Sequence, residues 1–282
     1  MTTTAGATTQ APRVDCHAHV FDLRRYPYAP EPGYKPLPNE AGTVEGFLAV
    51  LDAHGFTHGV LVNPTTSYGT DNRCMLDALE RGAGRLKGMA VIDAHITDAE
   101  LDSMTRCGVS GIRLNLAHHG LKPVTDPVAL RLLERLRERD WIIEIYTPVD
   151  HLPVALPVLE RMKVRVIVDH CGKPHASLPV VQRGFAELLE FGRRGGGWIK
   201  LSGAFRFSDL SWPHQDVDPF VEALIEAFTL DRAIWGSDWP FIQLSERTDY
   251  GPTVACLERW LPNPADRVKV LEETPARLFA FR

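Results

Sequence analysis

Short apolar runs alternate along this chain with longer stretches in which apolar residues recur at helical spacing. After a first run at residues 14–20, further runs lie at 59–63, 87–92, 111–116, 141–146, 164–170, 198–202 and 233–238. Short apolar runs bounded by loops are typical of buried strands. The pattern therefore predicts about eight strands.

The stretches between these runs predict helices. In the first of them, Val44, Phe47 and Leu51 fall on one helical face, and Gly55 marks the end of the helix. Comparable stretches lie at 72–83, 97–107, 127–139, 152–162 and 218–228. Strands that alternate with crossover helices form a parallel sheet, and eight such units that close on themselves form a (β/α)8 TIM barrel. The predicted fold class is therefore α/β, with this barrel as its architecture.

An open, doubly wound sheet is the alternative arrangement of the same elements. It is disfavoured because no glycine-rich turn of the G-x-G-x-x-G kind follows the first run. With 282 residues, 44% of them hydrophobic, the chain is long enough for one large core. We expect a loose polar tail at 1–12, which lacks the features of a signal peptide, and a single barrel domain at 13–282.

Charge and cysteine content narrow the class of protein further. The net charge is -5 and the basic residues are scattered, which disfavours nucleic acid and anionic membranes as partners. No run of about 18 apolar residues occurs, so no membrane span is expected. The five cysteines are an odd number without a Cys-x-x-Cys pair. They are interpreted as small core residues of a protein from the reducing cytoplasm.

The first run carries a His-x-His pair, His17 and His19. Because successive side chains of a strand point to opposite faces, Asp15, His17 and His19 are expected to share one face. Two imidazoles at this spacing can hold a divalent metal or polarise a carbonyl group. The alternative is a pair of hydrogen-bonded histidines in the core.

Polar residues also end most of the other predicted strands. In a barrel, the carboxyl ends of the strands carry the active site. The residues concerned are Arg113, Asn115, Glu144, Tyr146, Asp169, His170, Lys200, Ser202, Ser237 and Asp238. Each has a structural alternative: His170 as a core histidine, Asp238 as a helix cap, Asp169 as an ion-pair partner, and Lys200 with Ser202 as a polar barrel layer. For Glu144, a structural salt bridge is the favoured interpretation.

Five segments in sequence order carry a resemblance to a known family. They are Val-Asp-Cys-His-Ala-His-Val-Phe near the N-terminus, Val-Asp-His-Cys-Gly-Lys-Pro at 168–174, Ile-Lys-Leu-Ser-Gly at 199–203, Trp-Gly-Ser-Asp-Trp-Pro at 235–240, and Thr-Pro-Ala-Arg-Leu-Phe-Ala-Phe at 274–281. Together they resemble the amidohydrolase superfamily, in its amidohydrolase-2 branch. Residues 67–72 and 111–115, with Tyr146, are most similar to the group of 2-pyrone-4,6-dicarboxylate lactonases in that branch.

The resemblance implies roles for individual residues. His17, His19, His170 and Asp238 are expected to surround the scissile ester, with Asp238 as the general base that activates water. Substrate binding is expected from Ser67, Arg113, Tyr146, Arg206 and His119. Where that group of lactonases has a second arginine, this chain has His118-His119-Gly120. Histidine is a weaker partner for a carboxylate than arginine, so the substrate is expected to carry fewer or differently placed carboxylates.

The resemblance leaves the metal content open. Binuclear members of the superfamily bridge two ions with a carbamylated lysine on strand four and add a histidine on strand five, where this chain has Arg113 and Tyr146. A binuclear centre is therefore not expected. Two alternatives remain, metal-free activity or one divalent ion, zinc being the best suited to the ligand set His17, His19, His170 and Asp238.

The predicted function is hydrolysis of a lactone by Asp-activated water. The expected partner is a small carboxylated lactone, such as a pyrone carboxylate or a muconolactone-like ring, from the degradation of aromatic compounds. The first alternative is a metal-dependent decarboxylase of an aromatic or unsaturated carboxylate. It is disfavoured because that subgroup has Glu-x-His where this chain has His17-Ala18-His19. The second is a barrel kept as a binding protein. Sequence predicts neither the ring nor the oligomeric state.

Overall fold

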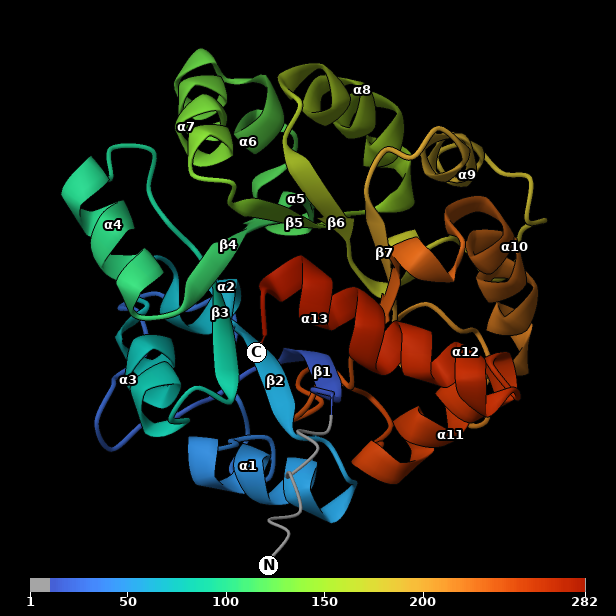
Figure 1. The fold of residues 1–282 in the computed structure, drawn as a ribbon, viewed down its shortest axis with the longest axis horizontal. Coiled ribbons are helices and arrows are strands. Elements are labelled where there is room, and N and C mark those ends of the chain that lie inside the picture. Colours follow the sequence, from blue (N-terminus) through green and yellow to red (C-terminus); the bar gives the residue numbers. More distant parts are fainter. Residues whose placement is uncertain (1–10, 282) are drawn as a thin grey trace, which may run out of the picture.

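Eight parallel strands lie at the centre of the computed structural model, which describes residues 11–281 (Figure 1). Residues 1–10 of the predicted tail lie outside this described part. Each strand pairs with the next one along the chain, from β1 to β8. The strands are β1 Val14–Ala18, β2 His58–Val62, β3 Leu86–Ala90, β4 Val109–Asn115, β5 Ile142–Tyr146, β6 Arg165–Val168, β7 Trp198–Leu201 and β8 Ala233–Trp235.

The last strand returns to the first, so that the sheet closes. Just beyond β8, the backbone N–H of Asp238 donates to the carbonyl of His17 at 2.9 Å. The N–H of His19 in turn donates to the carbonyl of Trp239 at 2.8 Å. The predicted TIM barrel is therefore confirmed, and the open sheet is wrong because a doubly wound sheet does not keep its strands in chain order.

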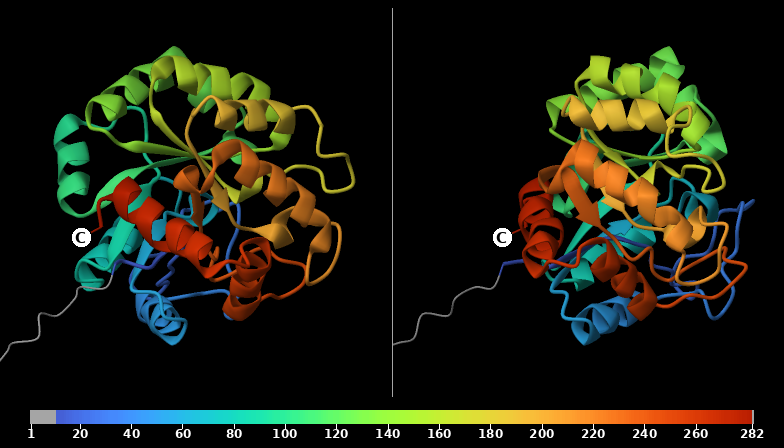
Figure 2. Two further views of the ribbon diagram at one scale, coloured as in Figure 1. Left: turned by 45° about the vertical axis from the view of Figure 1, so that its right-hand side comes forward. Right: turned by 90° about the vertical axis from the view of Figure 1, so that its right-hand side faces the viewer.

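Helices surround the barrel (Figures 1 and 2). Those between successive strands include α1 Val44–Ala53, α3 Arg73–Arg81, α4 Asp98–Arg106, α7 Pro127–Glu138, α8 Leu152–Met162, α9 Phe185–Arg193 and α10 Asp218–Phe228. Short helical turns follow β2 and β4, namely α2 Thr65–Tyr68, α5 Leu116–His119 and α6 Lys122–Thr125. Three helices follow β8: α11 Tyr250–Trp260, α12 Pro264–Val268 and α13 Thr274–Phe279.

Local signals explain where the predicted helices begin. The Thr43 side chain accepts from the N–H of Gly46 at the start of α1. Thr97 and Glu100 form a reciprocal capping box at α4. Each cap satisfies backbone donors that have no partner within the helix, and this fixes the first turn.

The apolar residues form two regions on either side of the strands. One lies inside the barrel and includes Val14, Val60, Ile142 and Ile167, while the larger one lies between the strands and the helices. Leu278, Phe279 and Phe281 at the C-terminus belong to the inner region. They pack against the residues that open the strands, so they close the amino end of the barrel and leave the carboxyl end for the site.

The first strand departs from simple alternation. Between Asp15 and Ala18, β1 advances three residues while its partner β2 advances two, from Gly59 to Leu61, which is a β-bulge. Val14 and Cys16 therefore point into the barrel and Asp15 points outward, where it accepts from the Tyr250 hydroxyl at 3.0 Å. The prediction that Asp15 shares a face with His17 is wrong because the extra residue reverses the alternation.

Two further sequence expectations concern the cysteines and membrane spans. Cys16, Cys74, Cys171 and Cys256 are buried, as predicted, but Cys107 is exposed because it ends α4 in the turn before β4. Over residues 11–281, no helix combines the length and the apolar character needed to cross a membrane.

Candidate active site

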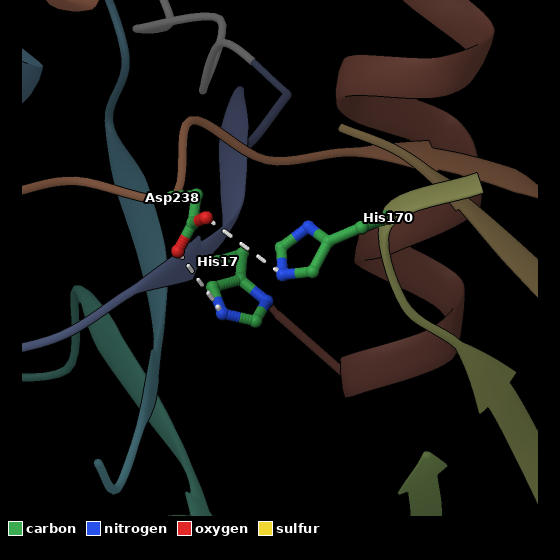
Figure 3. Close-up of side chains that lie close together, drawn as sticks. All are labelled: His17, His170 and Asp238. Carbon is green, nitrogen blue, oxygen red and sulfur yellow. Dashed lines mark ion pairs between the residues drawn. The ribbon is translucent and has the colours of Figure 1, made fainter. Parts of the chain in front are cut away.

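The four predicted catalytic residues converge at the carboxyl end of the barrel. The Asp238 carboxylate lies among three imidazole Nε2 atoms: those of His17 and His19 are 3.7 and 3.5 Å from its Oδ1, and that of His170 is 3.8 Å from its Oδ2. Figure 3 shows His17 and His170 directed at this carboxylate from different parts of the barrel wall. Only folding brings these residues together, since they come from β1 and from the loops after β6 and β8.

Unusual backbone geometry aims two of these side chains. His170 and Asp238 adopt φ angles of +47° and +64°, a region that residues other than glycine rarely occupy. His170 lies two residues after the end of β6 and Asp238 three residues after the end of β8, where such a conformation turns the chain at the carboxyl end of the barrel. His170 is buried, as the alternative of a core histidine expects, but it also lines the cavity that contains Asp238. Strain of this kind is concentrated at functional sites.

The Asp238 carboxylate is ionised. Burial disfavours its charge, but the Arg206 guanidinium, helped by the surrounding imidazoles, outweighs burial and holds the pKa of Asp238 well below its usual range. Arg206 pairs through Nε with Asp238 Oδ2. The other oxygen, Oδ1, is buried and has no hydrogen-bond partner among residues 11–281. One acceptor oxygen of a charged carboxylate therefore faces the cavity unused.

The imidazoles of His17 and His170 are neutral, and those of His170 and His19 are held in place by contacts at Nδ1. Burial lowers the pKa of His170 to about 3, and burial together with Lys200 lowers the pKa of His17 well below its usual value. His170 Nδ1 lies 2.9 Å from Ser202 Oγ, and His19 Nδ1 lies 2.7 Å from the carbonyl oxygen of Val62. These contacts leave each Nε2 atom facing Asp238.

A buried charged layer lies directly beneath the histidines. Lys200 Nζ is 2.7 Å from Glu144 Oε2 and 2.9 Å from Asp169 Oδ1. Arg113 adds a second cation, with Nη2 3.2 Å from Asp169 Oδ2. These contacts agree with the predicted ion pair of Asp169 and the predicted polar layer at Lys200. Burial, helped by the charge of Asp169, raises the pKa of Glu144 to about 8, so its contact with Lys200 is a hydrogen bond of a largely neutral carboxyl group at pH 7. Burial opposes the charge of Asp169, but the cations Lys200 and Arg113 hold its pKa well below the usual range.

Three of the predicted substrate-binding residues line a cavity above this layer. The cavity has a volume of about 70 Å³, and its wall includes Arg113, Tyr146 and Arg206 together with His19, His170 and Asp238. It adjoins a wider cleft of about 700 Å³, with which it shares Thr65, Arg113 and Asn115. The two cavities therefore have part of their walls in common.

Lys173 is a neighbour of the site that sequence reasoning missed. Its Nζ atom donates to the Tyr146 hydroxyl at 2.7 Å and lies 4.5 Å from the centre of that ring. Arg113 lies 4.7 Å from the same ring, so Tyr146 is held between two cations. Because its oxygen already accepts from Lys173, the Tyr146 O–H is free to donate into the cavity. Lys173 belongs to the quoted motif at 168–174, where it could have been singled out.

The other two predicted substrate-binding residues lie elsewhere. Ser67 is fully buried and donates its hydroxyl to the carbonyl of Tyr34 at 3.0 Å, which ties the loop around Tyr34 to α2. It is not among the residues that line the cavity around Asp238. His119 lines the wider cleft, next to His118 at a ring separation of 4.6 Å.

Among residues 11–281, two groups of side chains place possible metal-ligand atoms within 4.8 Å of one another. One comprises His17, His170 and Asp238, and the other His17, Glu144 and Asp169. Neutral imidazole and carboxylate are the ligands that zinc prefers. Both groups already have cationic neighbours, since Arg206 pairs with Asp238 and the Lys200 ammonium lies within the second group.

The fold is a closed (β/α)8 barrel, and three histidines surround an ionised carboxylate with one unused oxygen at its carboxyl end. This combination is typical of barrel enzymes that act on small molecules with water as a reactant. A family model described as amidohydrolase matches residues 14–281. The chain therefore belongs to the amidohydrolase family, as the sequence motifs predict.

Individual relatives are similar over nearly the whole chain. A 4-sulfomuconolactone hydrolase from Rhizobium radiobacter is 34% identical over 270 residues, which covers 94% of this chain and 89% of the relative. A 2-pyrone-4,6-dicarboxylate hydrolase from Comamonas testosteroni is 31% identical over 278 residues, with the same two coverages. A solved structure from Pseudomonas putida, provisionally described as a 2-pyrone-4,6-dicarboxylic acid hydrolase, is 33% identical with a TM-score of 0.86 and covers 97% of this chain and 99% of its own.

The decarboxylase alternative has much weaker support. A 2,6-dihydroxybenzoate decarboxylase, solved in complex with 2,6-dihydroxybenzoate, is 15% identical with a TM-score of 0.65. Similarity at this level reflects the barrel fold alone.

Proposed function

We propose that this protein hydrolyses the cyclic ester bond of a small carboxylated lactone. The observation that carries the proposal is the Oδ1 atom of Asp238, a buried oxygen of an ionised carboxylate with no hydrogen-bond partner among the described residues. A carboxylate in this state is suited to accept a proton from water. The relatives named as hydrolases of sulfomuconolactone and pyrone dicarboxylate support the same reaction class.

The reaction proceeds by attack of water on the lactone carbonyl carbon. Asp238 takes one proton from water as the new C–O bond forms, and the carbonyl oxygen becomes an oxyanion. Collapse of this tetrahedral intermediate breaks the ring C–O bond, and Asp238 returns its proton to the departing ring oxygen. Lactone and water thus give one hydroxy acid, and the carboxylate is regenerated. Donors directed at the oxyanion stabilise this intermediate.

The charges around the cavity support an anionic substrate. Arg113, Arg206 and Lys173 lie at or next to its wall, against the single carboxylate of Asp238. A charge-assisted hydrogen bond from arginine to a carboxylate contributes roughly 1.5 to 3 kcal/mol. We propose that Arg113 and Arg206 contact the substrate carboxylate and that the Tyr146 hydroxyl donates to an ester oxygen.

The test is a panel of lactones assayed with the purified protein. Carboxylated pyrones and muconolactones are paired with neutral lactones of the same ring, and acid release and carbon dioxide are measured in parallel. The proposal predicts acid release without carbon dioxide and a higher kcat/KM, by about tenfold or more, for the carboxylated member of each pair. Carbon dioxide release would point to the decarboxylase, and binding without turnover to a binding protein.

A further inference from the structure

In the hydrogen bond between Lys200 and His17, only Lys200 can be the donor. Its Nζ atom lies 2.9 Å from His17 Nδ1, while Glu144 and Asp169 hold the same nitrogen at 2.7 and 2.9 Å. All these side chains are buried. An ammonium group beside the Asp169 carboxylate and the Glu144 carboxyl group carries three N–H donors and no acceptor. Nδ1 of His17 must therefore accept the hydrogen bond.

This direction determines where the proton of the His17 ring lies. A neutral imidazole has one N–H and one acceptor nitrogen, so an acceptor at Nδ1 leaves the proton on Nε2. Nε2 is the atom of His17 that faces Asp238, 3.7 Å from its Oδ1, and it lies 3.3 Å from His19 Nε2. His17 thus presents a donor at the site. His17 itself is fully buried and is not among the residues that line the cavity around Asp238.

His19 provides independent evidence for the same proton position. Its Nδ1 atom faces the carbonyl oxygen of Val62, which only accepts, so that nitrogen carries a proton. The 3.3 Å contact between the Nε2 atoms of His17 and His19 needs a proton on one of them. With the His19 proton used at Nδ1, the proton in this contact belongs to His17.

The opposite tautomer of His17 is poorly accommodated. A proton on Nδ1 would find Asp169 Oδ1 at 3.5 Å, longer than the roughly 2.7 to 3.2 Å of an ordinary N–H···O bond. The same N–H would also face the Lys200 ammonium at 2.9 Å, donor against donor. Repulsion between two donors at that distance disfavours this form.

We propose that Lys200 is a positioning residue that keeps His17 in the Nε2–H form, so that His17 donates a hydrogen bond to the carbonyl oxygen of the lactone. The inference rests on the proposed hydrolysis, in which negative charge develops on that oxygen. An N–H fixed in place before the reaction stabilises this charge without reorganisation. Lys200 acts through His17 and does not itself touch the substrate.

The same proton position removes His17 from the possible metal ligands at the site. A metal ion binds an imidazole through a nitrogen lone pair, and the proton occupies that lone pair at Nε2. The second group of ligand atoms, from His17, Glu144 and Asp169, surrounds the Lys200 ammonium itself. These residues therefore do not fit an ion held by the His-x-His pair, and the ammonium supplies the fixed positive charge of this layer.

The direct test is the tautomer of His17 in the intact wild-type protein. With 15N-labelled histidine, long-range proton–nitrogen NMR spectra distinguish an N–H at Nε2 from one at Nδ1. The His17 signals are assigned by their loss in a His17→Gln variant. We expect a protonated Nε2 and an acceptor Nδ1. A proton on Nδ1, or a zinc-bound Nε2 after dialysis against zinc sulfate alone, would overturn the inference.

Substitution of Lys200 adds a kinetic test. Lys200→Met is combined with Glu144→Gln, so that Asp169 keeps Arg113 as its partner and the buried layer stays close to neutral. We expect kcat to fall about 10- to 100-fold with KM within about twofold, since a donor lost from the transition state lowers kcat. Lys200→Arg in the wild-type background should retain more activity, and Glu144→Gln alone should leave the His17 proton on Nε2. Wild-type kcat in the double variant would contradict the role.

The two measurements separate this inference from the proposed function. If the protein opens no lactone in the panel but the His17 proton lies on Nε2, the proposed hydrolysis is wrong. The inference that Lys200 sets the proton position of His17 is then still supported. If lactones are opened while the proton lies on Nδ1, hydrolysis stands and the role of Lys200 is wrong.

Discussion

Arg206 and Asp238 share an ion pair at the centre of the site. The guanidinium keeps Asp238 charged at the expense of its basicity, since a carboxylate with a strongly lowered pKa accepts protons less readily. Arg206 also lines the cavity, where a substrate carboxylate competes with Asp238 for it. If the proposed anionic lactone binds Arg206, we therefore expect the hold of Arg206 on Asp238 to weaken and the basicity of Asp238 to rise.

Replacement of Arg206 by Met should shift the decline of kcat/KM at low pH to a higher pH. A base with a lowered pKa is active above that pKa and loses activity as pH falls through it, so the wild-type decline should lie below pH 3.8, the ordinary pKa of an aspartate. Without Arg206, burial raises the pKa of Asp238, and the decline should move up by about one to three pH units. Arg206→Lys, which keeps the charge, should shift it less. Superimposable profiles for all three proteins would rule out this coupling.

At the scale of elements, the hydrophobic pattern was enough to predict the alternation of strands and helices. Periodicity records which face is buried, so it located all eight strands and the helices α1, α3, α4, α7, α8 and α10. It missed α9, the helices after β8 and the short turns α2, α5 and α6. It does not record a one-residue bulge, as at Asp15, or the positive φ angles of His170 and Asp238. These depend on contacts between distant segments, and they decide how the side chains at the barrel mouth are aimed.

Gly203, after β7, shows how closely such a loop supports the site. It has a φ of +65°, and a Cβ atom there would lie 2.7 Å from His170 Nδ1. Gly203→Ala should therefore lower kcat by about 10- to 100-fold through displacement of the imidazole, besides a cost in stability of about 1 to 2 kcal/mol.

Gly55 offers a matched control for this substitution. Its φ is +72°, and a Cβ atom would meet nothing within 4 Å. Gly55→Ala should cost a similar free energy of unfolding and leave kcat unchanged. Equal kcat values in the two alanine variants would show that Gly203 does not position His170.

In the whole molecule, the amino end of the barrel contributes to stability and the carboxyl end carries the site. The C-terminal segment after α12 closes the amino end, where Phe279 is buried in the inner apolar region. The charged and polar side chains collect at the carboxyl end. Such a division is general in these barrels and lets the loops vary without loss of the core.

Phe279→Ala should reveal this division. Loss of a buried phenylalanine should lower the free energy of unfolding by about 3 to 5 kcal/mol, measured by denaturant titration, while kcat/KM of the folded enzyme stays within about twofold. Val268→Ala, at a side chain that is 40% exposed on α12, should change stability by less than about 0.5 kcal/mol. A large loss of kcat/KM in Phe279→Ala at a temperature where the protein is folded would contradict the separation.

The central claim is that Asp238 activates water for attack on a lactone, and kcat of Asp238→Asn with the best carboxylated lactone tests it most directly. The amide keeps the volume of the side chain but cannot take the proton. We expect kcat to fall by at least about a hundredfold, within the range of general-base contributions. Asp102→Asn, at an exposed carboxylate on α4, should retain the wild-type rate. A wild-type kcat in a correctly folded Asp238→Asn variant would contradict the assignment of Asp238 as the base.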